Sequence, residues 1–257
     1  RNMQRNRKVV FVSHSHHFHG AEICLLETVR SLIRYGGIDV HVVVPWKKES
    51  HLGNELKKAG AVVHPFIINP KWVDYKLPAG RRIVWMKQSV RAFIEFWRFL
   101  RKEKPDMVIS NSIVSNPAFA LVARMQGHRF AWYIHELADL DHGFTFFAGK
   151  RFTFSIIRLL SNKIIFNSNF TFRHFMGNKK IDPRKMAVID YIVDSARLLD
   201  GAVSSITEKF HNIGTWEILI AGRTVEGKGQ EDLLNAAGLL KNKYGVQNFH
   251  VTVLGKV

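Results

Sequence analysis

Glu217-Ile-Leu-Ile-Ala-Gly-Arg-Thr-Val-Glu-Gly-Lys-Gly-Gln-Glu-Asp-Leu-Leu-Asn-Ala236 is the most informative segment of the chain. The apolar run at its start predicts a buried strand, and the apolar spacing at its end predicts an amphipathic helix. A glycine-rich turn joins the two and carries two cations, Arg223 and Lys228. Because a helix N-terminus offers free backbone N–H groups and a partial positive charge, this junction is suited to bind a phosphate group.

Strand and helix patterns alternate along the rest of the chain. Apolar runs of strand length alternate with segments in which apolar residues recur at helical spacing. We expect strands at 8–12, 39–44, 61–66, 106–110, 129–134, 163–166 and 186–189, and helices at 21–35, 52–58, 84–103, 117–126, 150–160 and 169–176. This alternation predicts an α/β fold in which a parallel sheet carries helices on both faces.

The alternation is interrupted once, which divides the chain into two predicted domains. We expect residues 1–193 to form an N-terminal Rossmann-like domain and residues 194–214 to form a linker without a clear strand. Residues 215–257 then form the first βαβ part of a second Rossmann-like domain. A βαβ unit needs neighbouring strands to cover its sheet. We therefore expect the 257 residues to be a fragment of a longer protein.

The composition favours a reduced, cytosolic setting and an anionic partner. The formal net charge is +17, and the single cysteine, Cys24, excludes an internal disulfide. No apolar run approaches the roughly 20 residues of a membrane-spanning helix, and the basic start of the chain lacks the signal-peptide pattern. The charge predicts a nucleotide, a nucleic acid, an acidic glycan or an anionic membrane surface as partner. Because the basic residues are spread along the chain, an arm that binds nucleic acid is disfavoured.

A second candidate for phosphate binding follows the first predicted strand. Residues 13–22 contain four histidines and Gly20, and ligands of open parallel sheets bind at the carboxyl ends of the strands. Gly20 would let the backbone approach a ligand closely, although a single glycine is equally typical of an ordinary strand–helix loop. The histidines lack the cysteine or carboxylate neighbours of a zinc site, so we expect no metal there.

His135 is the candidate catalytic residue. The strand predicted at 129–134 delivers this histidine to the carboxyl edge of the sheet, within reach of a bound ligand. The following Glu136 begins the zinc-protease pattern His-Glu-x-x-His, but the fifth position is Asp139 and the segment starts on a strand. The simpler alternative is a histidine that ends a strand and contacts no ligand.

The turn that carries Arg223 and Lys228 narrowly misses the pattern of a P-loop NTPase. Gly229 stands where G-x-x-x-x-G-K-[ST] requires a hydroxyl group for Mg²⁺. This difference argues against phosphate hydrolysis of the P-loop kind. Two aimed cations can instead stabilise the charge on a diphosphate leaving group without a metal. A solvated basic turn without a ligand is the alternative.

Four motifs, in their order along the chain, resemble the retaining glycosyltransferase family 4 with the GT-B fold. In that family two Rossmann-like domains face a cleft, and a nucleotide sugar binds mainly to the second. The motifs are His19-Gly-Ala-Glu22, Ile134-His-Glu136, Val188-Ile-Asp-Tyr-Ile-Val-Asp194, and Ala221-Gly-Arg with Lys228-Gly-Gln230. They are similar, in turn, to the family's Gly-Gly-x-Glu, His-Asp or His-Glu, Val-Ile-Pro-Asn-Gly-Val-Asp, and Gly-Arg with Lys-Gly.

The resemblance implies a role for each matching residue. Arg223 and Lys228 would hold the diphosphate of a nucleotide sugar such as a UDP- or GDP-sugar, and Gly20 would offer it a backbone N–H from the other domain. His135 would meet the donor sugar near the transferred carbon. The sugar would pass, with retention of configuration, to a glycan or a lipid-linked acceptor. The resemblance implies no metal and no other cofactor, and we expect no nucleic acid as partner.

Departures from the family pattern affect these expectations. His19 stands where the first glycine is usual, and Asp190, Tyr191 and Ile192 replace Pro-Asn-Gly. The family's later Glu-x7-Glu element, which holds the donor sugar and ribose, has no counterpart because the chain ends first. We therefore expect the fragment alone to bind the donor poorly and to be inactive.

The helix predicted at 84–103 is the candidate element for contact with a membrane. Its apolar stripe and its basic residues fall on opposite sides; the stripe is Met86, Val90, Phe93, Trp97 and Leu100, and the basic residues are Lys87, Arg91, Arg98 and Lys102. We favour a stripe that faces the core, and the alternative is docking on the inner face of an anionic membrane. For the whole chain, the alternative function is a non-catalytic basic module that binds polyanions or membranes through charge alone.

Overall fold

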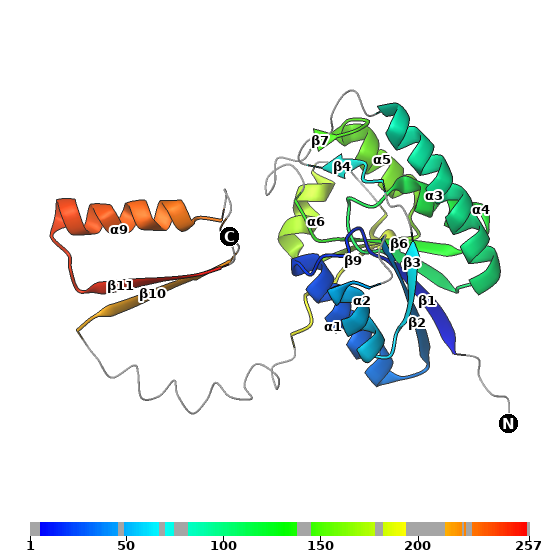
Figure 1. Cartoon of the computed structure of the whole chain (residues 1–257). Coiled ribbons are helices and arrows are strands. Elements are labelled where there is room, and N and C mark those ends of the chain that lie inside the picture. Colours follow the sequence, from blue (N-terminus) through cyan, green and yellow to red (C-terminus); the bar gives the residue numbers. More distant parts are fainter. Residues whose placement is uncertain are drawn as a thin grey trace. The chain divides into compact units, whose positions relative to one another are not determined.

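Two compact units make up the chain, and each is described by itself. Unit 1 comprises Arg1–Val193 and unit 2 comprises Asp194–Val257. The computed structural model describes residues 6–45, 49–66, 70–74, 82–137, 145–177, 182–193, 214–222, 224 and 228–255. Figure 1 shows the helices and strands of both units.

A seven-stranded parallel sheet forms the centre of unit 1, with the strand order β3-β2-β1-β5-β6-β8-β9. Its strands are β1 (Arg7–Val12), β2 (Ile38–Pro45), β3 (Val62–Phe66), β5 (Met107–Ser110), β6 (Arg129–Ile134), β8 (Lys163–Phe166) and β9 (Met186–Val188). Every neighbouring pair is parallel. The order runs outward from β1 in one direction and from β5 in the other. The carboxyl ends of β1 and β5 therefore border the topological switch point, where ligands of such sheets bind.

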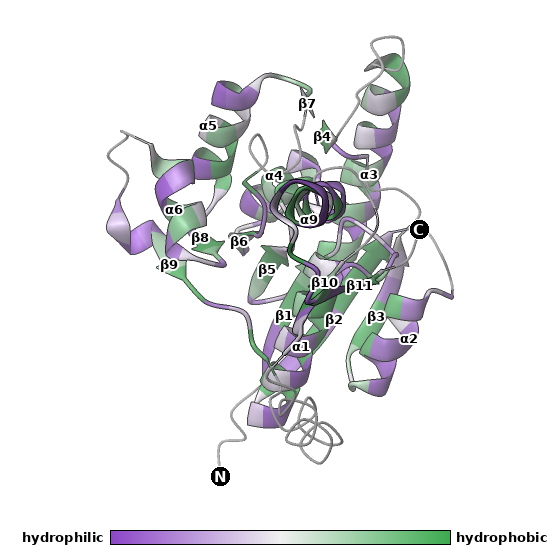
Figure 2. Cartoon of the chain, turned by 90° about the vertical axis from the view of Figure 1, so that its left-hand side faces the viewer, coloured by the Kyte–Doolittle hydropathy of each residue, from purple (hydrophilic) through white to green (hydrophobic). Residues whose placement is uncertain are grey.

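Helices cover both faces of this sheet (Figure 1). The helices described in unit 1 are α1 (Gly20–Tyr35), α2 (His51–Lys58), α3 (Arg82–Glu103), α4 (Pro117–Met125), α5 (Lys150–Leu160) and α6 (Asn169–Met176). Successive side chains of a strand point to opposite faces, so Phe11 packs with α1 and α2 while Val10 and Val12 pack with α3, α4 and α5. The strands of the sheet are mainly hydrophobic, as Figure 2 shows. The predicted parallel sheet with helices on both faces is confirmed.

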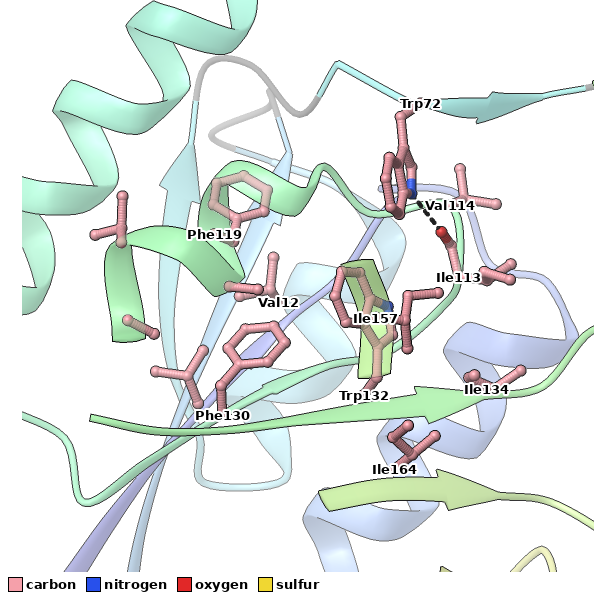
Figure 3. Close-up of a cluster of buried hydrophobic side chains, with 14 of the residues drawn as sticks. Val12, Trp72, Ile113, Val114, Phe119, Phe130, Trp132, Ile134, Ile157 and Ile164 are labelled. Carbon is pink, nitrogen blue, oxygen red and sulfur yellow. Dashed lines mark hydrogen bonds between the residues drawn. The ribbon is translucent and has the colours of Figure 1, made fainter. Parts of the chain in front are cut away.

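Aromatic residues tie the loop after β5 to the larger core (Figure 3). The indole N–H of Trp72 donates to the carbonyl oxygen of Ile113 at 2.7 Å, and that of Trp132 donates to the carbonyl oxygen of Ser112 at 2.7 Å. Both indoles are buried, and each polar N–H has a partner, as buried tryptophans require. These two bonds fix the backbone just beyond the carboxyl end of β5.

Side chains cap the starts of several helices. Ser50, Asn116 and Ser168 accept a hydrogen bond from a backbone N–H in the first turn of α2, α4 and α6. Such caps satisfy N–H groups that have no partner within the helix. The start of α1 differs, because His19 occupies the N-cap position without a capping bond from its side chain.

The ends of the predicted elements in unit 1 lie within two residues of the observed ones. Three short elements were not predicted from the sequence. They are β4 (Val73–Asp74), its antiparallel partner β7 (Thr145–Phe146), and the 3-10 turn η2 (Pro183–Lys185). Two residues are too few to show a strand period, so a pairing of this length leaves no pattern in the sequence.

The stripe predicted on α3 is wrong in its N-terminal half. Met86 and Val90 are 59% and 60% exposed, whereas Ala92, Phe96 and Leu100 are fully buried against the core. Phe93 and Trp97 pack beside this cluster. Apolar residues occupy more than one face of α3, so their periodicity fits two orientations, and the packing against the sheet selects one of them.

Unit 2 contains the expected βαβ arrangement, formed by β10 (Trp216–Ala221), α9 (Gln230–Tyr244) and β11 (Phe249–Leu254). The two strands pair in parallel. Leu219, Leu234 and Tyr244 are 61%, 55% and 65% exposed. Parallel sheets are normally covered on both faces, whereas unit 2 exposes apolar side chains on both its strand and its helix.

Replacing Phe96 with alanine should destabilise unit 1 by about 3–5 kcal/mol, because a fully buried ring leaves a cavity. Met86→Ala, on the exposed face of the same helix, should change the free energy of unfolding by less than about 0.5 kcal/mol. Urea unfolding of the two variants measures the difference. Equal losses would contradict the orientation of α3.

Candidate functional site

The carboxyl ends of β1, β5 and β6 bring together polar residues that lie far apart in the sequence. Asn111 directly follows β5, and its side-chain Nδ2 donates to the carbonyl oxygen of Ala21 in the first turn of α1 at 3.0 Å. Its backbone N–H donates to the carbonyl oxygen of Val12 in β1 at 2.9 Å. Its Oδ1 lies 3.2 Å from Nε2 of His135, which follows β6. Asn111 thus connects three elements at the topological switch point.

His135 lies at the sheet edge, as predicted, but its side chain is buried and only 8% of the residue is exposed. Nε2 contacts Asn111, and Nδ1 lies 3.2 Å from the hydroxyl oxygen of Tyr191. The carbonyl oxygen of His135 accepts a hydrogen bond from Nδ2 of Asn167 at 3.0 Å. Burial lowers the pKa of His135 to about 4, so the ring is neutral near neutral pH.

Glu136 is held by its neighbours. Its Oε1 accepts from the Ser112 hydroxyl at 2.8 Å, and its Oε2 accepts from the backbone N–H of His135 at 3.3 Å. Burial raises the pKa of Glu136 above its ordinary value. The metal motif and the family motif did not predict these contacts, through which Glu136 connects the loop after β5 to the loop after β6.

A second acidic residue, Glu22 of α1, is buried and faces His14. Its Oε1 lies 3.4 Å from Nδ1 of His14, and neither atom has a hydrogen-bond partner within the described part of the chain. Burial raises the pKa of Glu22 to about 7, and the nearby Glu136 adds to the shift. Burial also lowers the pKa of His14 to about 3. Both shifts favour the neutral forms of the pair.

Gly20 begins α1 at an exposed position. A Cβ atom placed there would meet no other atom within 4 Å, so the packing of the protein does not require glycine at this position. The first N–H groups of a helix have no partner inside the helix, and the side chain of His19 does not cap them. The start of α1 is therefore suited to receive an anion, and the role of Gly20 in binding a diphosphate stays a prediction.

Lys228 is exposed and lies two residues before the first residue of α9 in unit 2. Between them Gly229 has φ +80°, in the left-handed region that favours glycine, and provides no side-chain cap. The lysine thus stands at a helix N-terminus, which attracts anions. Arg223 lies outside the described residues, so its predicted pairing with Lys228 stays a prediction.

The histidines of the loop after β1 stack on one another. Ring centroids of His16 and His17 are 4.1 Å apart, and those of His17 and His19 are 5.7 Å apart. Within the residues that the structure describes, no group of three or more His, Cys, Asp or Glu side chains is arranged to hold a metal ion.

Several residues of this site were missed in the sequence analysis, namely Asn111, Ser112 and Asn167, and Tyr191 was noted only as a departure from a motif. A signal was available. Asn111 and Asn167 are polar residues that directly follow β5 and β8, as His135 follows β6. Because parallel strands end at one edge of a sheet, polar residues at such positions gather there.

Comparison with known proteins identifies the class of protein. The family model Glyco_transf_4, Glycosyltransferase Family 4, matches residues 18–197. The match spans more than half of the chain, and the chain therefore belongs to Glycosyltransferase Family 4. No curated protein matches the chain.

Several solved structures share the fold. Anabaena HepE in complex with UDP and glucose gives a TM-score of 0.64 at 13% identity, over 98% of this chain and 61% of that one. The glycosyltransferase of Rickettsia africae ESF-5 gives a TM-score of 0.61 at 15% identity, over 97% of this chain and 69% of that one. MurG of Acinetobacter baumannii gives a TM-score of 0.53 at 13% identity, over 98% of this chain and 67% of that one. The chain thus spans about two thirds of the length of these proteins, and the expected GT-B-like fold is confirmed.

The Glu22→Gln variant tests the buried acidic group through the pH dependence of stability. The folded-state pKa of Glu22, about 7, exceeds the ordinary 4.5, so folding retains a proton that the unfolded chain releases. The stability from this group is fully present below pH 4.5 and is lost as pH rises through 7. The melting temperature of Glu22→Gln relative to the native protein should therefore rise between pH 4.5 and 8. The corresponding change in the relative free energy of unfolding is up to about 3 kcal/mol.

Glu55→Gln provides a control of opposite sign. The Lys58 hydrogen bond lowers the pKa of Glu55, so its stabilising contribution is present above pH 4.5 and is lost at lower pH. Its melting temperature relative to the native protein should fall as pH rises through that acidic range. A flat difference for Glu22→Gln between pH 4.5 and 8 would contradict a protonated, buried Glu22.

Proposed function

We propose that this chain is part of an enzyme that transfers a sugar from a nucleotide sugar, with retention of configuration, to a glycan or a lipid-linked acceptor. The observation that carries the proposal is the family match over residues 18–197, which includes the site at the carboxyl edge of β1, β5 and β6. The position of this site at the topological switch point supports a bound nucleotide-like ligand.

The proposed donor is a nucleoside diphosphate sugar, with UDP as the first nucleotide to test. The Anabaena HepE structure contains UDP and glucose, which supports this choice. Lys228 at the start of α9, together with Arg223, would neutralise the diphosphate. Backbone N–H groups at Gly20 would contribute from unit 1.

In the proposed reaction the bond between the anomeric carbon and the diphosphate breaks while the bond to the acceptor oxygen forms. The acceptor hydroxyl gives its proton to the departing phosphate oxygen. Fixed cations and backbone donors stabilise the charge that develops on this leaving group, and no metal is needed in this scheme. His135 has a low pKa and is neutral, so it would act as a hydrogen-bond partner of the donor sugar and would not act as a cation.

Substitutions at Lys228 test the proposed diphosphate site in the full-length protein. Lys228→Ala should weaken UDP binding about 10- to 100-fold, because it removes a charge-assisted contact of about 1.5–3 kcal/mol. Lys241→Ala, in the last turn of the same helix, is the matched control and should have little effect. Isothermal titration with UDP measures both. Equal losses, together with binding to any polyanion, would favour the non-catalytic basic module.

Gly20→Ala separates a ligand contact from a structural role. The added methyl group has free space and alanine favours the helix, so the melting temperature should stay the same or rise. UDP binding should nevertheless weaken by about tenfold, roughly 1.4 kcal/mol, because the methyl group crowds a close backbone contact. Unchanged UDP affinity in this variant would exclude Gly20 from the diphosphate site.

We also propose that α3 docks the enzyme on an anionic membrane that carries the acceptor. An exposed apolar row runs along the helix at Ile83, Met86, Val90 and Ile94. Lys87, Arg91 and Arg98 are exposed on neighbouring positions. An apolar row beside cations is typical of helices that lie in the membrane interface, and the net charge of +17 adds attraction to anionic lipids. Within the described residues, no helix is long and apolar enough to cross a bilayer.

Replacing both Val90 and Ile94 with glutamate should weaken binding to vesicles of anionic phosphatidylglycerol by at least about tenfold, because it removes apolar contact and adds repulsion. Both side chains are exposed, so the fold should persist. Leu121→Glu, at an exposed apolar position of α4, is the control. Co-sedimentation with vesicles measures binding. Unchanged sedimentation of the double variant would exclude docking through α3.

A further inference from the structure

The hydrogen-bond partners of His135 determine which of its ring nitrogens carries the proton. Nδ2 of Asn111 donates to the carbonyl oxygen of Ala21 at 3.0 Å, which leaves Oδ1 facing Nε2 of His135 at 3.2 Å. An amide oxygen only accepts hydrogen bonds, so Nε2 carries the ring proton. In a neutral imidazole the other nitrogen, Nδ1, then presents a lone pair.

The hydroxyl of Tyr191 faces this lone pair at 3.2 Å. Nδ2 of Asn167 donates to the same hydroxyl oxygen at 2.8 Å, and Oδ1 of Asn167 is taken by the hydroxyl of Thr171 at 2.7 Å. The Tyr191 oxygen therefore accepts from Asn167, and its own proton is available for Nδ1. The side chain of Cys24 also lies within hydrogen-bond reach of this hydroxyl, but a thiol sulfur is a weaker acceptor than an imidazole nitrogen.

The two partners of His135 differ in how firmly they are held. Asn111 is 1% exposed, and its backbone and side-chain N–H groups donate to β1 and α1. Tyr191 is 42% exposed and lies beyond β9, in a segment without helix or strand. Its ring stacks on that of His135, with centroids 5.6 Å apart and planes at 25°. Tyr191 is thus the partner that can leave without disturbing the sheet.

We propose that the hydroxyl of Tyr191 occupies the place from which a hydroxyl group of the donor sugar hydrogen-bonds to Nδ1 of His135. Both groups donate to the same lone pair, so sugar binding replaces one hydrogen bond with another. Asn111 keeps the ring in its orientation and tautomer throughout the exchange. The identity of the ligand rests on the proposed function, whereas the Tyr191–His135 contact and the tautomer do not.

The first experiment needs no ligand. Nitrogen-15 NMR of the histidine rings should show His135 protonated at Nε2, with Nδ1 shifted by an accepted hydrogen bond. Tyr191→Phe keeps the stacked ring but removes the donor, so Nδ1 should shift to the value of an unbonded nitrogen while Nε2 stays protonated. Tyr133→Phe is the control, because that ring also contacts His135 but its hydroxyl donates to the carbonyl oxygen of Ile189. A proton on Nδ1, or an Nδ1 signal unchanged in Tyr191→Phe, would overturn the proposal.

The second experiment uses UDP-glucose and UDP as probes with the full-length protein. Tyr191→Phe should bind UDP-glucose two- to tenfold more tightly, because the sugar no longer competes with a protein hydroxyl. UDP lacks the transferred sugar, so its affinity should not change, and Tyr133→Phe should alter neither. Unchanged or weaker UDP-glucose binding by Tyr191→Phe, with UDP still bound, would refute the exchange. If the native protein binds neither probe, the proposed function fails, and the NMR result still decides whether Tyr191 occupies Nδ1.

Discussion

The side-chain amide of Asn111 is the interaction on which the arrangement of the site depends. Its nitrogen donates to α1, its oxygen faces His135, and its backbone is bound to β1. A side-chain amide offers both a donor and an acceptor, and leaving either buried atom unsatisfied costs about 1–3 kcal/mol. Through this one residue the packing of α1 on the sheet sets the orientation of the imidazole at the switch point.

The apolar core and the polar edge form one structure. Two buried indoles hold the backbone of Ser112 and Ile113, and the hydroxyl of Ser112 in turn holds Glu136 beside His135. The packing of the two tryptophans in the core therefore determines the position of the Ser112 hydroxyl and, through it, of the Glu136 carboxyl group. The same burial lowers the pKa of His135 and raises the pKa of Glu22, so it favours the neutral form of each. The burial of these groups therefore shapes the electrostatic character of the site.

Much of this fold could be predicted from the sequence, because long apolar runs and helical spacing record burial directly. The position of His135 at the end of β6 followed from the same pattern. The hydrogen-bond partners of His135 could not be predicted in this way. Asn111 and Tyr191 lie 24 and 56 residues away along the chain, and a local sequence pattern does not relate residues at such separations. The outward face of α3 was also misplaced, because apolar residues on several faces make the orientation of a helix ambiguous. The antiparallel pair β4 and β7 was too short to leave a pattern.

Tyr191 lies two residues before Val193, where unit 1 ends. Its hydroxyl is bound to the imidazole, while the chain that follows belongs to the next unit. Tyr191 lies outside any helix or strand, whereas Asn111 is hydrogen-bonded to β1 and α1. The contact between Tyr191 and His135 thus attaches the last residues of unit 1 to the carboxyl edge of its sheet through side chains alone.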